Sequence, residues 1–281
     1  MKKAGVLYLV ATPIGNMEDI TLRALRVLKE ADVIAAEDTR QTLKILNHYG
    51  IKNTLVSYYE HNKKVRGTYI INLLLEGKNV ALVSDAGSPG ISDPGEDLVK
   101  AAIDQGITVT AVPGPSAVIA GLVLSGLPSG RFAFEGFLPV NKKLRSERLE
   151  TLKRENRTLV FFEAPHRLAR TLKDLRNAFG NRNIAFAREL TKKFEEIGRC
   201  TLDDAIELFE QKTPRGEFVL VVEGADTCVQ EDGAGKWRDI SIKEHMKIYL
   251  DRGLDKRQAM KMVAEDRNIS KRDVYKSLLK K

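Results

Sequence analysis

The segment that decides the fold is NVALVSDAGSPGISDPG, residues 79–95. Its first part, residues 79–84, is an apolar run of the length that a fully buried strand needs. The second part, residues 85–95, is rich in glycine and proline and leads into a helix predicted at about residues 95–105. A buried strand followed by such a loop and a helix is typical of α/β proteins, in which ligands bind beyond the carboxyl ends of parallel strands.

The same alternation extends over the first 115 residues. Helices are predicted after Thr21, which can cap the first of them, and over residues 42–49. Further buried strands are predicted at residues 6–10, 33–36 and 108–112. Short strands that alternate with helices indicate a largely parallel sheet, so residues 1–115 are predicted to form one α/β domain.

The second half has a different pattern, which begins after the break at residues 113–116. Strands are predicted at residues 132–137, 158–163, 184–189 and 217–224, and helices at residues 117–124, 141–157, 167–179 and 202–211. This order predicts a second α/β domain, residues 116–228, with a mixed sheet. The predicted fold class is therefore α/β, with two α/β domains and a cleft between them.

A small basic appendage is predicted at residues 237–281, after a polar, glycine-rich linker at residues 226–236. Three short helices are expected at residues 241–251, 256–266 and 270–279. Residues 236–281 carry 14 basic and 7 acidic side chains, so they hold +7 of the chain's net charge of +8. Such asymmetry favours contact with a polyanion such as nucleic acid, although a solvated helical tail fits the charge equally well.

Composition excludes several classes of protein. With 43% hydrophobic and 30% charged residues, the 281-residue chain can bury a core, and no apolar run reaches membrane-span length. No secretory or transit signal is apparent, so we expect a cytoplasmic protein. The two cysteines and four histidines have no metal-ligand spacing, and we expect no metal. The chain contains neither a GxxxxGK[ST] phosphate loop nor a G-x-S-x-G nucleophile motif.

Three glycine- and proline-rich loops follow predicted strands, at residues 11–16, 84–95 and 112–117. Glycine lets the backbone approach a ligand closely, and proline fixes the shape of a loop. Asp85 comes directly after a buried strand, where its carboxylate could bind an amine or hydroxyl group, or only cap the turn. Any one loop is more often a plain turn, but three at one sheet edge favour a binding site.

Four stretches of this sequence resemble one known family. They are residues 9–21 (LVATPIGNMEDIT), 37–40 (EDTR), 84–90 (SDAGSPG) and 188–192 (RELTK). They are similar to the small-subunit ribosomal RNA branch of the tetrapyrrole (class III) methylase superfamily, over about residues 5–225. Relatives outside this branch more often carry G-x-G-x-G in the first loop and G-D-P after the later strand, and Pro13 and Ala86 interrupt those patterns here.

The resemblance implies a homodimer that holds S-adenosylmethionine between two α/β domains. It also implies methylation of the ribose 2′-hydroxyl of a cytidine in the decoding region of 16S rRNA, within the 30S subunit. Carried onto this chain, the predicted cofactor-binding residues are Pro13, Ile14, Asp85, Gly87, Ser88, Ser116, Ala117, Phe162, Ala187 and Glu217.

A ribose hydroxyl is a poor nucleophile, so a base that removes its proton would accelerate the transfer. The predicted catalytic residues are Glu37, Asp38, Glu163, Glu189 and Lys192, with His61 as a further candidate base. Each of these polar side chains can also be explained as part of a helix cap or of a surface ion pair. The predicted RNA-binding residues are Arg40, Lys142, Lys143, Arg145, Arg188, Lys256, Arg257, Lys271 and Arg272.

Two other functions stay open at this point. A methylase of the same superfamily acting on a small tetrapyrrole would not need the basic appendage. A non-catalytic RNA-binding protein built on a methylase fold would bind RNA but not S-adenosylmethionine. The three loops that could bind a cofactor contain no evident disruption, which favours an enzyme.

Overall fold

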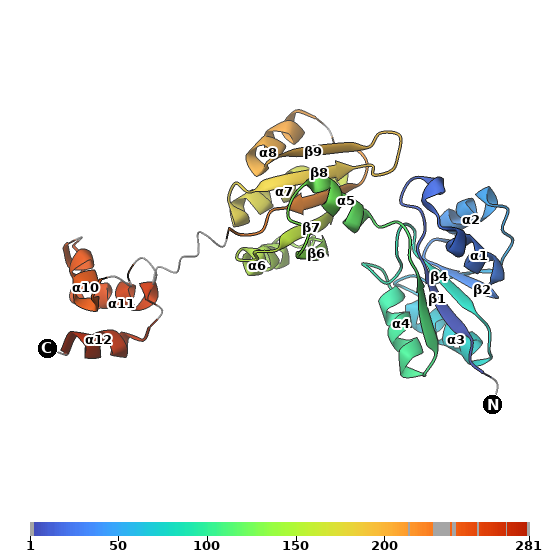
Figure 1. The fold of residues 1–281 in the computed structure, drawn as a ribbon, viewed down its shortest axis with the longest axis horizontal. Coiled ribbons are helices and arrows are strands. Elements are labelled where there is room, and N and C mark those ends of the chain that lie inside the picture. The colour runs from blue at the N-terminus through green and yellow to red at the C-terminus, as the bar shows by residue number, and fades with distance from the viewer. Residues whose placement is uncertain are drawn as a thin grey trace. The chain divides into compact units, whose positions relative to one another are not determined.

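A computed structural model describes residues 3–212, 214–226, 237, 240–251, 253–267 and 269–279 (Figure 1). The chain divides into two compact units, Met1–Gly224 and Ala225–Lys281, and each is described by itself. Apart from Asp226, the predicted linker lies outside the described residues. The first unit contains two sheets, one on each side of residue 115 in the sequence. The domain bounds 1–115, 116–228 and 237–281 stay predictions.

The first sheet is parallel throughout, with strand order β3-β2-β4-β1-β5. Its strands are β1 (Val6–Val10), β2 (Val33–Ala36), β3 (Leu55–Ser57), β4 (Val80–Val83) and β5 (Thr108–Val112). The helices around it are α1 (Leu22–Glu30), α2 (Thr39–His48), α3 (Lys63–Leu75) and α4 (Gly95–Asp104), with a short 3-10 helix, η1 (Met17–Asp19). The largely parallel sheet predicted from the alternation is confirmed.

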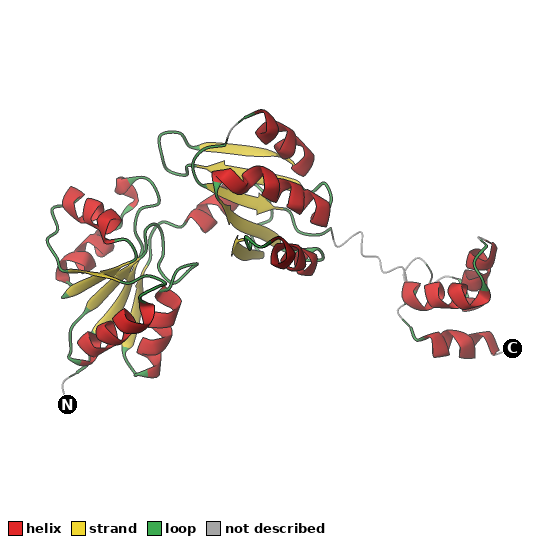
Figure 2. Cartoon of the chain, turned by 180° about the vertical axis from the view of Figure 1, so that it is seen from behind, coloured by secondary structure: helices red, strands yellow, loops and turns green. Residues whose placement is uncertain are grey.

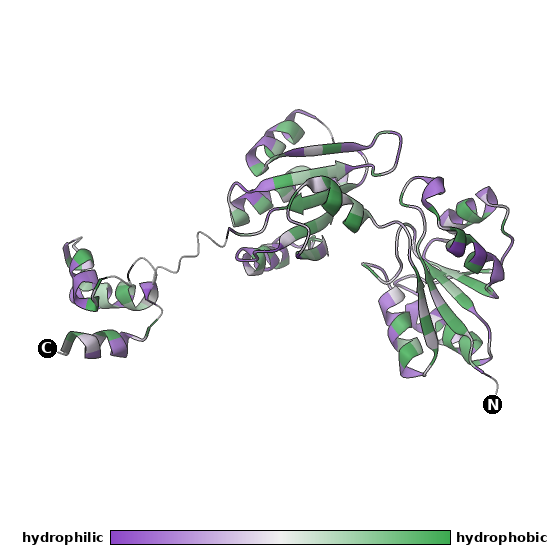
Figure 3. Cartoon of the chain, in the orientation of Figure 1, coloured by the Kyte–Doolittle hydropathy of each residue, from purple (hydrophilic) through white to green (hydrophobic). Residues whose placement is uncertain are grey.

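Both faces of this sheet are covered by helices (Figure 2). On one face, Leu82 packs with Ile70 of α3 and Leu98 of α4, and on the other, Ile34 packs with Leu28 of α1. Burial on both faces explains why the strands are apolar at successive positions rather than alternating. Apolar residues accordingly dominate the strands in Figure 3, whereas the helices mix apolar and polar positions.

The second sheet is mixed, with strand order β6-β7-β10-β8-β9. β6 pairs with β7 in parallel, and the other neighbours are antiparallel. Its strands are β6 (Phe132–Phe137), β7 (Thr158–Glu163), β8 (Asn183–Arg188), β9 (Glu196–Thr201) and β10 (Phe218–Val222). The helices are α5 (Ala117–Ser125), α6 (Lys142–Leu152), α7 (Pro165–Phe179) and α8 (Leu202–Gln211).

Helices cover both faces of the second sheet as well. The face that includes Phe161 and Leu220 packs against α7 and α8, whereas Val160 and Val219 face α5. The predicted mixed α/β sheet is therefore confirmed. Because neighbouring residues of a strand point to opposite faces, the two faces carry different chemistry, which decides the roles of Phe162 and Glu163 below.

The second unit contains α10 (Ile242–Asp251), α11 (Lys256–Asp266) and α12 (Lys271–Leu279), close to the three predicted helices. Met246, Val263 and Val274 form its apolar core. His245 is completely buried between charged neighbours in the same unit. Among the described residues of the whole chain, no helix is long and apolar enough to cross a membrane.

Candidate active site

The loops that follow β1 and β4 are held together by backbone hydrogen bonds. The N–H of Thr12 donates to the carbonyl of Gly87 at 2.9 Å, and the N–H of Gly87 donates to the carbonyl of Thr12 at 3.0 Å. Thr12 Oγ1 also donates to the Ser84 carbonyl at 3.2 Å. Gly87 has a φ of +78°, a conformation that residues with a Cβ rarely adopt. A glycine at this position therefore lets the two loops join at the sheet edge.

Two carboxylates shape the loop after β4. Asp93 accepts hydrogen bonds from the backbone N–H groups of Gly90, at 2.9 Å, and Gly95, at 2.7 Å. Asp85 accepts the backbone N–H of Asp38, in the loop between β2 and α2, at 2.9 Å. Asp93 thus organises its own loop, whereas Asp85 connects that loop to the next strand of the sheet.

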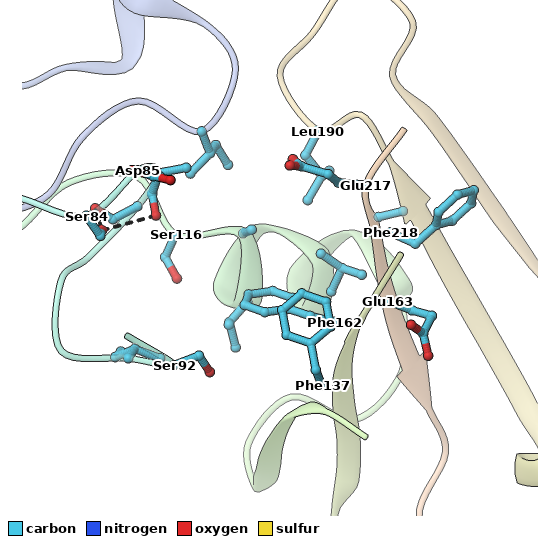
Figure 4. A pocket seen from close by; sticks show the side chains of 18 of the residues that line it. Ser84, Asp85, Ser92, Ser116, Phe137, Phe162, Glu163, Leu190, Glu217 and Phe218 are labelled. Atoms are coloured by element: carbon cyan, nitrogen blue, oxygen red, sulfur yellow. Dashed lines mark hydrogen bonds between the residues drawn. The ribbon is translucent and has the colours of Figure 1, made fainter. Parts of the chain in front are cut away.

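These loops form one wall of a cavity of about 390 Å³, which we call the main cavity. Ser84, Asp85, Ser92 and Ser116 lie on one side of it, and Phe162 with other residues of the second sheet lies opposite (Figure 4). The remaining lining residues are Ile14, Glu37, Ala86, Gly87, Ser88, Ile91, Asp93, Ala117, Val118, Phe137, Glu163, Ala164, Pro165, Ala187, Glu189, Leu190, Lys192, Glu217, Phe218 and Val219. Residues from both sheets therefore meet around one space.

The predicted cofactor-binding residues gather here, with one difference. Those that line the main cavity are Ile14, Asp85, Gly87, Ser88, Ser116, Ala117, Phe162, Ala187 and Glu217. Pro13 is buried and is not part of the lining. Ser116 caps α5, because its side chain accepts the N–H of Ile119, so the positive end of that helix lies at the cavity. Their contact with a cofactor stays a prediction.

Glu37 is the predicted catalytic residue whose surroundings favour proton uptake. It is half-buried and lines the main cavity. Burial raises the pKa of Glu37 above its usual value, and the negative charges of Asp85 and Asp93 raise it further. A hydrogen bond from the Asp85 backbone opposes the shift. A carboxylate with a raised pKa is the better proton acceptor.

Glu189, Lys192 and Glu217 form a charged group on the opposite wall. Lys192 Nζ lies 3.0 Å from Glu189 Oε1 and 3.4 Å from Glu217 Oε2. Burial lowers the pKa of Lys192, but the hydrogen bond to Glu189 and the charge of Glu217 outweigh it and raise the pKa. Burial raises the pKa of Glu189, but the hydrogen bonds from Lys192 and from the Glu217 backbone, together with the charges of Lys192 and Arg188, outweigh it and lower the pKa. Both groups therefore stay charged at neutral pH.

The backbone of this wall is strained. Glu189 has a φ of +51° and Thr191 a φ of +64°, although neither is a glycine. Such conformations cost on the order of 1–3 kcal/mol each and are found mainly where a site requires them. Gly15, in the loop after β1, lies against the same segment, since a Cβ there would be 2.8 Å from the Leu190 carbonyl.

Asp38 and His61 lie outside the main cavity. Asp38 caps α2 and holds Arg40, with its Oδ2 2.7 Å from Arg40 Nη2. The hydrogen bonds from Arg40 lower the pKa of Asp38 to about 2. His61 is exposed in the turn before α3. Neither side chain is among the residues that line the cavity, so neither is placed to act as its base.

Glu163 is among the residues that line the main cavity, but its carboxylate is bound by neighbouring groups of the same domain. Thr171 Oγ1 donates to Glu163 Oε2, the Ala164 N–H donates to Oε1 at 2.8 Å, and Arg167 Nε lies 3.4 Å from Oε1. Phe162, the preceding residue, belongs to the opposite face of the strand, and Figure 4 shows the Glu163 carboxylate directed away from Asp85. The prediction that Glu163 is catalytic is therefore corrected to a structural role.

Most of the predicted RNA-binding side chains are exposed. They are Arg40, Lys142, Lys143, Lys256, Arg257, Lys271 and Arg272. Arg188 is half-buried and pairs with Glu196 at 2.9 Å. Arg145 differs, because its side chain is 3% exposed and its Nε lies 2.7 Å from Asp174 Oδ2. Arg145 is therefore not the exposed surface residue that the sequence suggested.

Several lining residues were not singled out from the sequence. Phe137 is the last residue of β6 and Leu190 follows β8, and because both are apolar they carried no polar signal. Ser92 lies within a loop that was singled out, and its φ of +62° is a strained conformation.

Within the described part of the chain, no group of three or more His, Cys, Asp and Glu side chains is arranged to hold a metal ion.

Comparison with known proteins identifies the family. The family model of tetrapyrrole (corrin/porphyrin) methylases matches residues 6–206. A ribosomal RNA small subunit methyltransferase I from Halalkalibacterium halodurans is 51% identical over 271 residues, which cover 96% of this chain and 93% of that protein. The chain belongs to the methyltransferase I branch of the tetrapyrrole methylase family. It is a methyltransferase, and S-adenosylmethionine is its methyl donor.

Solved structures of tetrapyrrole methylases share this fold. The uroporphyrin-III C-methyltransferase from Thermus thermophilus is 25% identical, with a TM-score of 0.57, covering 78% of this chain and 94% of that one. A structure of the Thermus thermophilus enzyme complexed with S-adenosylhomocysteine has a TM-score of 0.55 and 22% identity, covering 78% and 97% of the two chains. The fold class predicted from the sequence is therefore confirmed.

The main cavity fits S-adenosylmethionine by its chemistry. The methyl donor carries a sulfonium and an ammonium group, and carboxylates of Glu37, Asp85 and Asp93 line one wall. Apolar side chains, among them Ile14 and Phe162, offer a surface for an adenine ring. Carboxylates and apolar side chains of the main cavity would therefore hold the donor.

Proposed function

We propose that this methyltransferase modifies the ribose 2′-hydroxyl of a cytidine in the decoding region of 16S rRNA. The observation that carries the proposal is the 51% identity, over nearly the whole chain, to a protein named for small-subunit ribosomal RNA. The acceptor is the assembled 30S subunit, because a small basic unit offers little sequence readout and suits recognition of RNA shape.

When bound, S-adenosylmethionine supplies an electrophilic methyl group. Most of the catalysis then comes from holding the acceptor oxygen in line with that group, which the closely held loops after β1, β4 and β5 support. These loops are fixed by backbone bonds between Thr12 and Gly87 and by Asp93. Such a preformed wall limits the cost of ordering the site at each turnover.

Glu37 is the general base of this proposal. It lines the main cavity, and its raised pKa makes it a better proton acceptor than Glu189, whose pKa is lowered. A positioned base contributes roughly 10²–10⁴-fold to such a transfer. Lys192 stays protonated, so its role is to position Glu189 and Glu217 and to attract the RNA backbone.

The exposed basic side chains of α6 and of the C-terminal unit dock the RNA. Lys142 and Lys143 begin α6, and Lys256 and Lys271 begin α11 and α12. Side chains of this kind neutralise phosphates, which gives an affinity that falls as salt concentration rises. Replacing Lys256 and Lys271 by Glu should weaken binding to the 30S subunit and leave the affinity for S-adenosylmethionine unchanged.

We further infer a homodimer in the cytoplasm. Exposed apolar side chains on α5 and on the turn between β8 and β9 support a dimer, since Val123 is 67% exposed and Phe194 68% exposed. Sedimentation of the purified chain, and of Val123→Glu, measures this directly. A monomer at micromolar concentration would contradict it.

The deciding experiment is transfer of a labelled methyl group from S-adenosylmethionine to 30S subunits that lack their own modification. We expect label on one decoding-region cytidine, at its 2′-oxygen, mapped by nuclease digestion and mass spectrometry. Label on a base or on another nucleotide would contradict the assignment. Free 16S rRNA, tested in parallel, shows whether the assembled subunit is required. A precorrin acceptor in a third reaction tests the small-molecule alternative.

A further inference from the structure

A second cavity, of about 470 Å³, lies beside the main cavity and shares Phe137 and Ala164 with it. The other residues that line it are Val140, Arg145, His166, Arg167, Arg170 and Thr171. We call it the arginine cavity. Its lining combines three guanidinium groups with the rings of Phe137 and His166 and the aliphatic side chain of Val140. None of its arginines was used in the proposed transfer step.

Arg145 is the reason to regard this cavity as a built site. Its Nε pairs with Asp174 at 2.7 Å, and its Nη1 donates to the carbonyls of Pro139 and Val140 at 3.0 and 2.9 Å. Its Nη2 is buried and has no hydrogen-bond partner among the described residues. A buried donor of this kind costs free energy unless a ligand or water satisfies it.

The rest of the lining favours an anion. Arg167 donates to the Leu138 carbonyl and lies 3.4 Å from Glu163, so it is fixed in place. Arg170 is 56% exposed, and its Nε lies 4.0 Å from Asp174 Oδ2, which is too far for a hydrogen bond. Its guanidinium group is therefore accessible. The cavity also includes Ala164, the N-cap of α7, which has no capping side chain, so the positive end of that helix adds to the potential.

The apolar part of the lining suits a nucleobase. Phe137 is 55% exposed and Val140 73% exposed, although both are apolar. Phe137 lies between the two cavities, with its ring centroid 5.6 Å from that of Phe162. An exposed aromatic ring next to guanidinium groups is a common arrangement for stacking a base of single-stranded RNA.

We propose that the arginine cavity binds the nucleotide next to the methylated one in the rRNA strand. Arg145, Arg167 and Arg170 take its phosphodiester group, and its base stacks on Phe137. This inference rests on the proposed function, since it places the acceptor ribose in the main cavity. An RNA strand that passes from one cavity to the other then holds the reacting hydroxyl in register.

Arg170 is the residue to test, because it is exposed and only distantly paired, at 4.0 Å, with the Asp174 oxygen that Arg145 contacts at 2.7 Å. The matched control is Arg176→Ala on the same helix, where Arg176 pairs with Asp203 and does not line the cavity. Steady-state methylation of 30S subunits is measured at several salt concentrations with saturating S-adenosylmethionine. KM for the donor is measured in parallel.

We expect Arg170→Ala to raise KM for the subunit about tenfold, from the loss of one charged hydrogen bond. The slope of log KM against log salt should fall by about 0.7–0.9, the value for one phosphate contact. Arg170→Lys should keep that slope, because it keeps the charge, and Arg176→Ala should match the unchanged protein. KM for S-adenosylmethionine should be the same in all four.

Three results would overturn the inference, each in a different way. If the unchanged protein methylates the subunit but Arg170→Ala keeps its KM and salt slope, the arginine cavity is not a phosphate subsite, and the proposed function stands. If the unchanged protein methylates no ribosomal RNA, the proposed function is wrong, and the subsite fails with it. An equal rise in KM for both substrates would indicate damage to the fold, so the assignment would also be wrong.

Discussion

Asp85 accepts the backbone N–H of Asp38 at 2.9 Å, and this bond joins the loop after β4 to the loop after β2. Glu37, the residue before Asp38, is thereby held beside Asp85 at the edge of the main cavity. Two neighbouring carboxylates disfavour a second negative charge, so the pKa of Glu37 is raised by Asp85 in addition to burial. The pairing therefore creates a proton acceptor as well as a fixed loop.

Replacing Glu37 by Gln should lower kcat by roughly 10²–10⁴-fold, because the amide cannot take the proton. KM for the 30S subunit should change little. In the unchanged protein kcat should fall as pH drops through the raised pKa of Glu37, since only the carboxylate is a base. The variant should lack this acidic limb. Glu30→Gln, an exposed residue of α1, is the control, and equal pH profiles would rule Glu37 out as the base.

Replacing Glu163 by Gln should affect stability and spare the chemistry. The carboxylate is buried and serves Thr171, the Ala164 N–H and Arg167, so loss of its charge should cost about 1–3 kcal/mol in the free energy of unfolding. At a temperature where the variant is folded, kcat should be within about twofold of the unchanged value. Urea unfolding and initial rates measure the two effects. A large loss of kcat without loss of stability would restore Glu163 as a catalytic residue.

Replacing Gly15 by Ala should weaken binding of S-adenosylmethionine. A Cβ at this position would lie 2.5 Å from Lys192 Cγ and 2.8 Å from the Leu190 carbonyl, so the loop after β1 must move away from the opposite wall. Overpacking of this kind typically costs about 1–3 kcal/mol. Isothermal titration with S-adenosylhomocysteine measures it, with Gly130→Ala as the control because nothing lies near that Cβ. An unchanged affinity for S-adenosylhomocysteine would mean that binding does not depend on the close contact between Gly15 and the segment that contains Leu190 and Lys192.

Stability of the C-terminal unit should decrease below about pH 6.5, the ordinary pKa of histidine. Burial and the charge of Arg267 lower the pKa of His245, against the opposing effect of Asp266. Arg267 Nε donates to Nδ1, so the neutral ring carries its proton on Nε2, facing Asp266. Since the folded pKa lies below the unfolded one, this stability is present above pH 6.5 and is lost as pH falls through the folded pKa.

Trp237, the only tryptophan of the chain, reports on that change. Its ring stacks on His245 with centroids 3.7 Å apart. Its fluorescence during urea unfolding should show a midpoint that falls between about pH 7.5 and 5.5. His245→Gln should remove the dependence. A midpoint that stays constant in the unchanged protein would contradict the buried neutral state.

Strong local patterns predicted most of the fold. β2, β5, β6 and β7 match their predicted bounds, because each is a short apolar or alternating run between turn signals. The elements that were not predicted include β3, α3 and β9. The apolar residues of α3, Ile70 to Leu74, are nearly consecutive and lack helical spacing. β9 reads EIGRCT and is an edge strand without an apolar face, so only its pairing with β8 defines it.

The site was predictable where backbone and charge leave a local signature. Glycine, proline and aspartate in the loops pointed to the main cavity, and the family resemblance added Phe162 and Ala187. Side-chain direction was not predictable, since Glu163 and Phe162 are adjacent and their side chains lie on opposite faces. Nor was the burial of Arg145 predictable, because it depends on Asp174, which is distant in sequence.

The position of β10 in the second sheet has a consequence for synthesis of the chain. β10 lies between β7 and β8 and pairs with both, yet it follows them in sequence and is translated after them. Until Phe218–Val222 leaves the ribosome, β7 and β8 each present an unpaired apolar edge, which is prone to aggregate. The parallel sheet, complete at Val112, can assemble earlier. A nascent chain stalled before residue 218 should therefore bind chaperones strongly and bind no methyl donor.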